Sequence, residues 1–198
     1  NEVRAGEAVR PVEAQEEAEY RFDLVPADQA LSLWTYALTA PFPTLLDGVT
    51  LEQARGLWAG SQDETLTGWR FLLTDQALAV LRTAWGEPAE GMVDVLPAGE
   101  LLDAAWEAGS VLSLVPFEKL EPRWKVLRVD GISPLDQDFQ PEDYALTFGF
   151  GFAEGQQPPV ELALTAANRD PEKMTVLMMT GVTALVRATA HRMEIKGL

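Results

Sequence analysis

Cysteine is absent from the 198-residue chain, and His191 is its only histidine. Without cysteine the chain has no disulfide, no thiolate zinc site and no cysteine nucleophile. A Ser-His-Asp triad or a multi-histidine metal site would have to be built around His191 alone. A lone histidine is more often an ordinary helix-surface residue, and we interpret His191 in that way.

Basic residues are also few, with 15 Lys and Arg against 31 Asp and Glu and a net charge of −16. A chain of this charge repels a polyphosphate backbone, so we expect no nucleic acid partner. The same charge disfavours docking on an anionic membrane surface. No apolar run approaches the roughly 20 residues needed to span a bilayer, so we expect no direct membrane span in this sequence.

The common nucleotide and hydrolase motifs GxGxxG, GxxxxGK[ST] and GxSxG do not occur. Three acidic pairs, Asp63/Glu64, Asp136/Asp138 and Glu142/Asp143, lack the spacing of a calcium loop and are interpreted as solvated loop charge. From these observations we predict that the chain is not an enzyme and that it has no cofactor and no metal site.

Apolar residues are plentiful, at 47% of the chain with six Trp and eight Phe, so the sequence is expected to fold. The Glu-rich residues 1–19 have too few apolar side chains to hold themselves down and are predicted to be an acidic flexible arm. Residues 20–155 are predicted to form one α/β domain. Residues 160–198 are predicted to form a C-terminal strand-helix segment.

Strand and helix patterns alternate along the predicted domain. Strands are predicted at 34–40, 69–73, 92–96, 111–115, 124–129 and 144–152. Helices are predicted from Leu51 to near Gly60, from Thr74 to Gly86 and over 101–109. Trp58, Trp85 and Trp106 fall on the apolar stripes of these helices and are predicted to lie in the core. This alternation favours a mainly parallel sheet flanked by helices.

Several of these segments carry a family resemblance when they are read in order: Gly48-Val49-Thr50-Leu51-Glu52-Gln53, Leu57-Trp58-Ala59-Gly60 and Val126–Pro134 (VLRVDGISP). Over residues 22–152 they resemble the second lobe of type-2 periplasmic binding proteins, in particular the phosphate-binding branch. The resemblance implies an α/β lobe with a solute-binding cleft. The phosphate-gripping Ser-Gly-Thr of that branch would fall on Thr74-Asp75-Gln76, where an acidic side chain would repel phosphate.

A second resemblance concerns the tail, from Asn168-Arg169-Asp170-Pro171 to Leu185. It is similar to the linker and first strand of the poly-gamma-glutamate capsule-synthesis family, which has a metallophosphoesterase-like fold. In that family the strand ends in a Gly-Asp motif whose Asp supports a metal. Here Thr180-Gly181-Val182-Thr183 lacks the acid.

The function that we expect first is a non-catalytic binding or recognition module outside the cytoplasm, at the cell surface, secreted, or anchored by parts outside this chain. Its cleft should lie at the carboxyl ends of the strands, where open α/β sheets bind ligands. The residues predicted to bind the ligand are Phe42, Thr44, Thr74, Gln76 and Phe117. The helix that begins after Thr74 also offers an anion its free N–H groups, although an ordinary N-cap explains the same residues.

The expected partners are a small-molecule ligand or a surface protein, together with a downstream domain or assembly partner. Two other functions stay open. One is a structural subunit of a cell-surface or membrane-associated assembly, which large apolar surface patches would favour. The other is the N-terminal fragment of a capsule-synthesis family protein, which a metal bound by this chain would favour.

Overall fold

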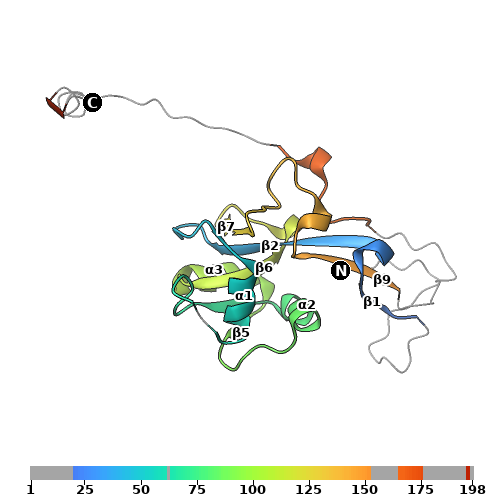
Figure 1. The fold of residues 1–198 in the computed structure, drawn as a ribbon, viewed down its shortest axis with the longest axis horizontal. Coiled ribbons are helices and arrows are strands. Elements are labelled where there is room, and N and C mark those ends of the chain that lie inside the picture. The colour runs from blue at the N-terminus through green and yellow to red at the C-terminus, as the bar shows by residue number, and fades with distance from the viewer. Residues whose placement is uncertain (1–19, 62, 153–164, 176–194, 197–198) are drawn as a thin grey trace.

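The computed structural model describes residues 20–61, 63–152, 165–175 and 195–196. Over these ranges the chain is an α/β structure with one large sheet, a small two-stranded sheet and α-helices α1 to α3 (Figure 1). The predicted arm 1–19, most of the predicted segment 160–198, and His191 lie outside the described residues. No helix in the described ranges combines the length and the apolar character that crossing a membrane requires.

The large sheet has seven strands in the order β1-β9-β2-β6-β4-β5, with β7 also paired to β2. Their bounds are Phe22–Val25 for β1, Ser32–Pro41 for β2, Arg70–Leu73 for β4, Val93–Val95 for β5, Val111–Pro116 for β6, Trp124–Val126 for β7 and Thr147–Phe152 for β9. The small sheet pairs β3 (Gly48–Val49) in parallel with β8 (Arg128–Val129). A strand lies within each of the six ranges predicted for the domain, although the predicted strand 124–129 is divided between β7 and β8 in different sheets. Strands β1 and β3 were not predicted.

The expected α/β class with flanking helices is confirmed, and the strand directions need a correction. Strand β4 pairs in parallel with β5 and β6. Strand β2 is antiparallel to β6, β7 and β9, and β1 is antiparallel to β9, so the sheet is mixed rather than mainly parallel. A local pattern can identify a strand, but its direction depends on pairing with distant residues such as Thr39 with Ser113.

Helices α1 and α2 begin at the predicted caps, whereas α3 begins at Ala98, three residues before the predicted start. Helix α1 (Leu51–Trp58) starts with a capping box, in which the Gln53 N–H donates to Thr50 Oγ1 at 3.0 Å and Gln53 Oε1 accepts from the Thr50 N–H at 2.8 Å. In α2 (Asp75–Trp85), Thr74 Oγ1 accepts from the Ala77 N–H at 3.2 Å. Helices α2 and α3 (Ala98–Ala108) end before glycines with positive φ, which stops each helix without strain.

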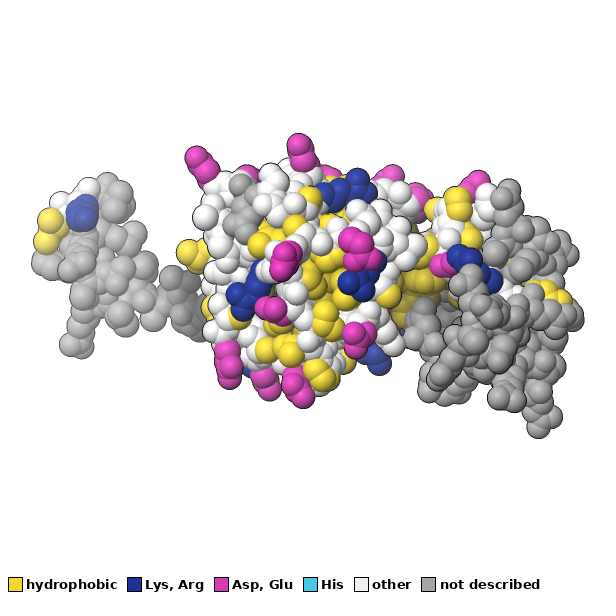
Figure 2. Space-filling model, turned by 90° about the horizontal axis from the view of Figure 1, so that it is seen from below, with side chains coloured by type: hydrophobic (Ala, Val, Ile, Leu, Met, Phe, Trp, Pro, Cys, Tyr) yellow, Lys and Arg dark blue, Asp and Glu magenta, His cyan; other side chains and the backbone are white. Residues whose placement is uncertain are grey.

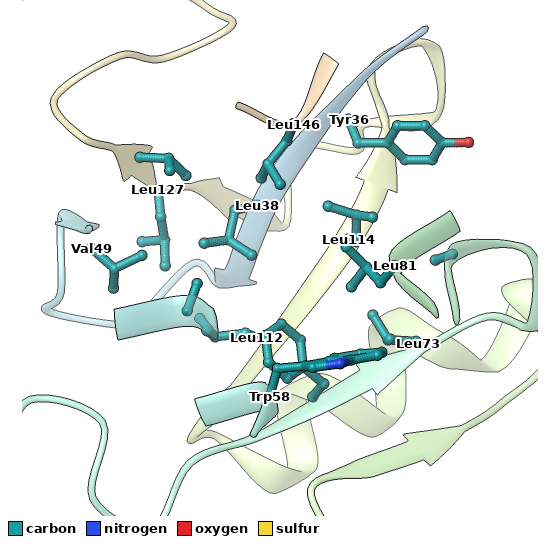
Figure 3. Close-up of a cluster of buried hydrophobic side chains, with 14 of the residues drawn as sticks. Tyr36, Leu38, Val49, Trp58, Leu73, Leu81, Leu112, Leu114, Leu127 and Leu146 are labelled. Atoms are coloured by element: carbon teal, nitrogen blue, oxygen red, sulfur yellow. The ribbon is translucent and has the colours of Figure 1, made fainter. Parts of the chain in front are cut away.

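The larger apolar core lies on the sheet face that α1 and α2 cover, where strand leucines such as Leu38 and Leu112 meet the helices (Figure 3). Trp58 is 2% exposed in this core, and its indole N–H donates to the Gly86 carbonyl at 3.0 Å. Trp85 is partly buried and packs edge-on against Trp58, with ring centroids 5.9 Å apart. The predicted core positions of Trp58 and Trp85 are therefore confirmed.

The smaller core lies on the opposite face, between α3 and residues such as Val115 and Trp124. The prediction that Trp106 belongs to the core is wrong, because its side chain is 37% exposed. Helix α3 buries Leu101, Leu102 and Ala105. Trp106 lies at the edge of that stripe, where the Arg123 guanidinium covers its ring at 4.9 Å.

Candidate functional site

A cleft of ≈ 910 Å³ opens over the carboxyl ends of β4 and β6. One of its walls is the first part of α2, with Gln76, Ala79 and Val80. The other wall is the start of α3, with Ala98 and Gly99, continued by the turn that follows β6. The cleft thus lies where two helices on opposite faces of the sheet begin.

The chain path explains why both helices begin at this edge. Strands β4 and β5 are parallel neighbours, and each leads directly into a helix, α2 after β4 and α3 after β5. The two helices cover opposite faces of the sheet, as their separate cores show. In open α/β sheets, a crevice forms outside the carboxyl ends of strands whose connections leave toward opposite faces. The cleft occupies the position that this rule gives to a ligand site.

Aromatic side chains line the side of the cleft that faces α2. Trp34 and Tyr36 belong to β2, and Phe150 belongs to β9. Trp34 and Tyr36 are two positions apart, and β9 residues with even numbers pair opposite even-numbered residues of β2, so these rings share one sheet face. The Trp34 indole N–H donates to Ser32 Oγ at 2.8 Å, which fixes the ring at the strand.

Tyr36 belongs to the aromatic side and lies near a charged residue of the cleft, Glu118. Its side chain is 5% exposed, and in Figure 3 its ring points away from the leucines of the core with the hydroxyl outermost. Burial, together with the nearby Glu118 carboxylate, raises the pKa of Tyr36 to about 12. The phenol is therefore neutral at physiological pH and can donate or accept a hydrogen bond in the cleft.

Glu118 belongs to the short 3-10 helix Phe117–Lys119 (η3) and is held by a distant residue. Its Oε2 accepts from the Asn168 side-chain amide at 2.7 Å. The same Asn168 side chain makes two hydrogen bonds with the Thr35 backbone, accepting from its N–H at 2.8 Å and donating to its carbonyl at 2.9 Å. The carboxylate is therefore fixed to the strand that carries Trp34 and Tyr36.

Arg169 packs against Phe117, the residue that precedes Glu118. It is 8% exposed and lies over the rings of Phe139 at 4.7 Å and Phe117 at 5.7 Å. Its guanidinium donates to the Pro134 carbonyl and to the Asp136 carbonyl, each at 2.8 Å, and burial lowers its pKa. These contacts hold the turn after β6, and hence Glu118, in place.

The structure brings together some of the residues predicted to bind a ligand and separates others. Thr74 and Gln76 both line the cleft. Phe117 does not, because its ring lies against Arg169, although its neighbours Pro116 and Glu118 line the cleft. The ligand-binding roles of these residues remain predictions.

Phe42 and Thr44 do not reach this cleft, contrary to the expectation that they share one with Thr74. They follow β2, which runs antiparallel to β6, so they lie beyond the opposite end of that pairing from Pro116. Phe42 is 62% exposed, and its N–H donates to the Arg123 carbonyl at 3.0 Å. The Thr44 carbonyl accepts from Lys125 Nζ at 2.8 Å.

Sequence reasoning missed the aromatic side and Glu118. The signal for the rings was available, since aromatic residues recur at every second position in 34–36 and 148–152. Such a period of two places side chains on one face of a strand. Nothing in the sequence signals Glu118, whose position depends on a contact with Asn168, 50 residues away.

The charge in the cleft is small and negative. The charged side chains among its described lining residues are Glu118, Lys119 and Glu121. On the face of the molecule seen in Figure 2, acidic side chains surround an apolar area and basic ones are fewer. Within the described parts of the chain, no three Asp, Glu or His side chains gather closely enough to hold a metal ion.

Two solved structures share this fold. One is an ABC-type phosphate transport receptor from Vibrio cholerae, 11% identical, with a TM-score of 0.53 over 69% of this chain and 61% of the receptor. The other is a substrate-binding protein from Clostridium perfringens, assigned to phosphate ABC transport and solved with bound phosphate. It is 12% identical, with a TM-score of 0.50 over 65% of this chain and 57% of its own. No protein-family model matches the sequence, and neither does any curated protein.

These structures confirm the expected fold, that of periplasmic substrate-binding proteins, at a sequence identity that carries no ligand with it. The chain spans less than two thirds of the length of either structure. The resemblance of the tail to the capsule-synthesis family is not tested by either structure, and residues 176–185 of that tail lie outside the described residues.

Proposed function

We propose that the chain is a non-catalytic binding module that holds a small molecule in the cleft between the starts of α2 and α3. The observation that carries this proposal is the cleft itself, ≈ 910 Å³ of open space at the carboxyl ends of β4 and β6. That volume falls in the range of small-molecule sites, and its mixture of aromatic rings with a few fixed polar groups is typical of them. Thr74 and Gln76 would supply polar contacts from the α2 wall.

The fold supports the same proposal. The two proteins that share it are named as a transport receptor and a substrate-binding protein. Proteins of that kind work outside the cytoplasm, and we place this chain there, with residues 20–155 as the binding domain. The chain spans 61% and 57% of those proteins. We propose that a surface closing the open side of the cleft, beyond the two walls formed by α2 and α3, comes from a partner or from another domain.

A filled-cleft variant tests the proposal. Ala79 is exposed on the α2 wall, and Ala79→Trp would place an indole in the cleft. Thr83→Trp is the matched control, because Thr83 is exposed one turn later on α2 and does not line the cleft. Ligand-observed NMR with a mixture of small organic cations, anions and neutral aromatic compounds should detect binding to the wild type and to Thr83→Trp, and none to Ala79→Trp.

Binding that survives Ala79→Trp would move the site elsewhere. No binding to any of the proteins would favour the structural-subunit alternative, in which the fold serves an assembly rather than a ligand. Thermal unfolding of both variants shows whether each tryptophan is tolerated, since both replace exposed helix residues.

A further inference from the structure

The aromatic side of the cleft presents apolar, electron-rich surface from Trp34, Tyr36 and Phe150. These side chains come from two neighbouring strands, and no arginine is among the described residues that line the cleft. Arg169, which neighbours the Asn168 that holds Glu118, lies over the rings of Phe117 and Phe139. Ring faces attract cations through their quadrupole, most strongly where water is partly excluded.

A carboxylate is fixed beside this aromatic side. Glu118 lies close enough to Tyr36 to disfavour ionisation of the phenol. Its Oε2 is held by Asn168, which is in turn bonded to the Thr35 backbone between Trp34 and Tyr36. Because this chain of contacts ends on β2 itself, the exposed Glu118 carboxylate is held beside the residues that carry the two rings.

The Tyr36 hydroxyl adds an uncommitted acceptor. It has no hydrogen-bond partner among the residues that the structure describes, whereas the Trp34 indole N–H is already bonded to Ser32. A phenol oxygen accepts readily from an ammonium N–H. The corner formed by Trp34, Tyr36 and Glu118 therefore offers the partly exposed Trp34 ring, the Tyr36 hydroxyl as an acceptor and one negative charge.

The other charges in the cleft also favour a cation over an anion. The described lining includes two carboxylates, Glu118 and Glu121, and one ammonium, Lys119. Lys119 follows Glu118 directly in a 3-10 helix, where successive side chains point roughly 120° apart, so it does not share the direction of Glu118. The net charge of −16 also draws cations toward the protein and repels anions.

We propose that the Trp34, Tyr36 and Glu118 corner binds an organic cation, a quaternary ammonium or a protonated amine on a small alkyl chain. This inference rests on the proposed function, because it names the ligand class of the same cleft. The cationic group lies over the Trp34 ring, beside the Tyr36 hydroxyl, and pairs with Glu118, and the alkyl part lies toward the apolar side chains of α2.

Two probes of nearly the same shape separate charge from size. Choline carries a trimethylammonium group, and dimethylbutanol is the neutral compound in which carbon replaces the charged nitrogen. Isothermal titration calorimetry should give choline a dissociation constant of about a millimolar or tighter. Dimethylbutanol should bind at least about tenfold more weakly, because it lacks the cation.

Variants then locate the charge. Glu118→Gln keeps an acceptor for Asn168 and removes only the negative charge, so it should weaken choline about tenfold and leave dimethylbutanol unchanged. Glu172→Gln removes an exposed carboxylate that does not line the cleft, and it should change neither probe. Trp34→Leu should weaken choline while circular dichroism shows that the fold persists.

The outcomes separate this inference from the function on which it rests. Equal affinity for the two probes, or unchanged choline binding in Glu118→Gln, overturns the cation inference. If the two probes bind the wild type equally well and Ala79→Trp abolishes their binding, the cleft remains a binding site but for a different ligand class. If Ala79→Trp leaves the binding of every probe unchanged, the proposed function fails as well.

Discussion

The side chain of Asn168 replaces a missing strand neighbour for Thr35, accepting from its N–H at 2.8 Å and donating to its carbonyl at 2.9 Å. Strand β6 ends opposite Tyr36, so the backbone of β2 would otherwise have no partner on that side at residue 35. The short bridge between Leu33 and Ala167 continues the same arrangement.

The first prediction follows from this contact. Asn168→Ala should lower the free energy of unfolding by about 1 to 3 kcal/mol, because it leaves buried backbone groups of Thr35 unpaired. Urea denaturation measures the change. Lys173→Ala, which removes only an exposed ion pair with Asp170, is the control and should change stability by less than about 0.5 kcal/mol. Equal effects of the two variants would show that Asn168 is not holding β2.

Trp58 and Trp106 give a matched pair of core and surface indoles. Trp58→Ala should cost about 3 to 5 kcal/mol, since it empties a fully buried site and leaves the Gly86 carbonyl without its donor. Trp106→Ala removes a partly exposed ring under Arg123 and should cost about 1 kcal/mol or less. Chemical denaturation followed by circular dichroism compares them, and a Trp106 effect as large as that of Trp58 would contradict the assignment.

Gly149 is required by a close approach rather than by its backbone angles. A Cβ there would lie 2.8 Å from Ala30 Cβ and 2.8 Å from the Val25 carbonyl oxygen. Gly149→Ala should therefore destabilise the protein by about 1 to 3 kcal/mol. Gly99→Ala, in open space within α3, should instead be neutral or stabilising by up to about 1 kcal/mol. Thermal unfolding should show shifts of opposite sign, and a neutral Gly149→Ala would mean that β1 moves aside.

Asp136 makes stability depend on acid pH. Its hydrogen bond with Arg128 and the Ser133 N–H hold the pKa of its carboxyl below the ordinary value of 3.8. The ionised group therefore stabilises the fold above pH 3.8, and this contribution is lost as the pH falls through the lowered pKa. Asp136→Asn should cost about 1 kcal/mol at pH 7 and converge with the wild type in strong acid. A difference that persists unchanged at low pH would assign the effect to packing instead.

Phosphate is expected to bind no more tightly than about millimolar, equivalent to roughly 4 kcal/mol. The cleft has two carboxylates against one lysine, and Asp75 occupies the first turn of α2, whose N–H groups would otherwise attract an anion. Calorimetry with inorganic phosphate at near-physiological salt measures this. A micromolar dissociation constant would show that Asp75 is turned away or that another site binds the anion.

The sequence predicted what depends on nearby residues. Thr50 and Thr74 cap their helices as expected, and the helices end at the expected glycines, because a cap involves only the residues of one turn. The sequence did not predict where Phe42 and Thr44 lie, because their position depends on the direction of β2. That direction is set by pairing with β6, more than 70 residues downstream, which no local pattern encodes.

The candidate site was only partly predictable for the same reason. Thr74 and Gln76 follow from one strand-to-helix transition. The corner of Trp34, Tyr36 and Glu118 combines a strand near the start of the chain, a turn in its middle and an asparagine close to its end. Alternating aromatics indicated which face the rings share, but only the assembled sheet shows that this face borders a cleft.

Strand β2 has a consequence for biosynthesis. The strands that pair with it in the described part of the chain, β6, β7 and β9, come much later in the sequence. While a ribosome makes residues 42–110, the apolar stretch of β2 has emerged or is emerging without any of these partners. Unpaired strand edges of this kind invite association with other chains. A nascent chain of this protein should therefore be most prone to aggregation, and most dependent on a chaperone, until β6 has left the exit tunnel.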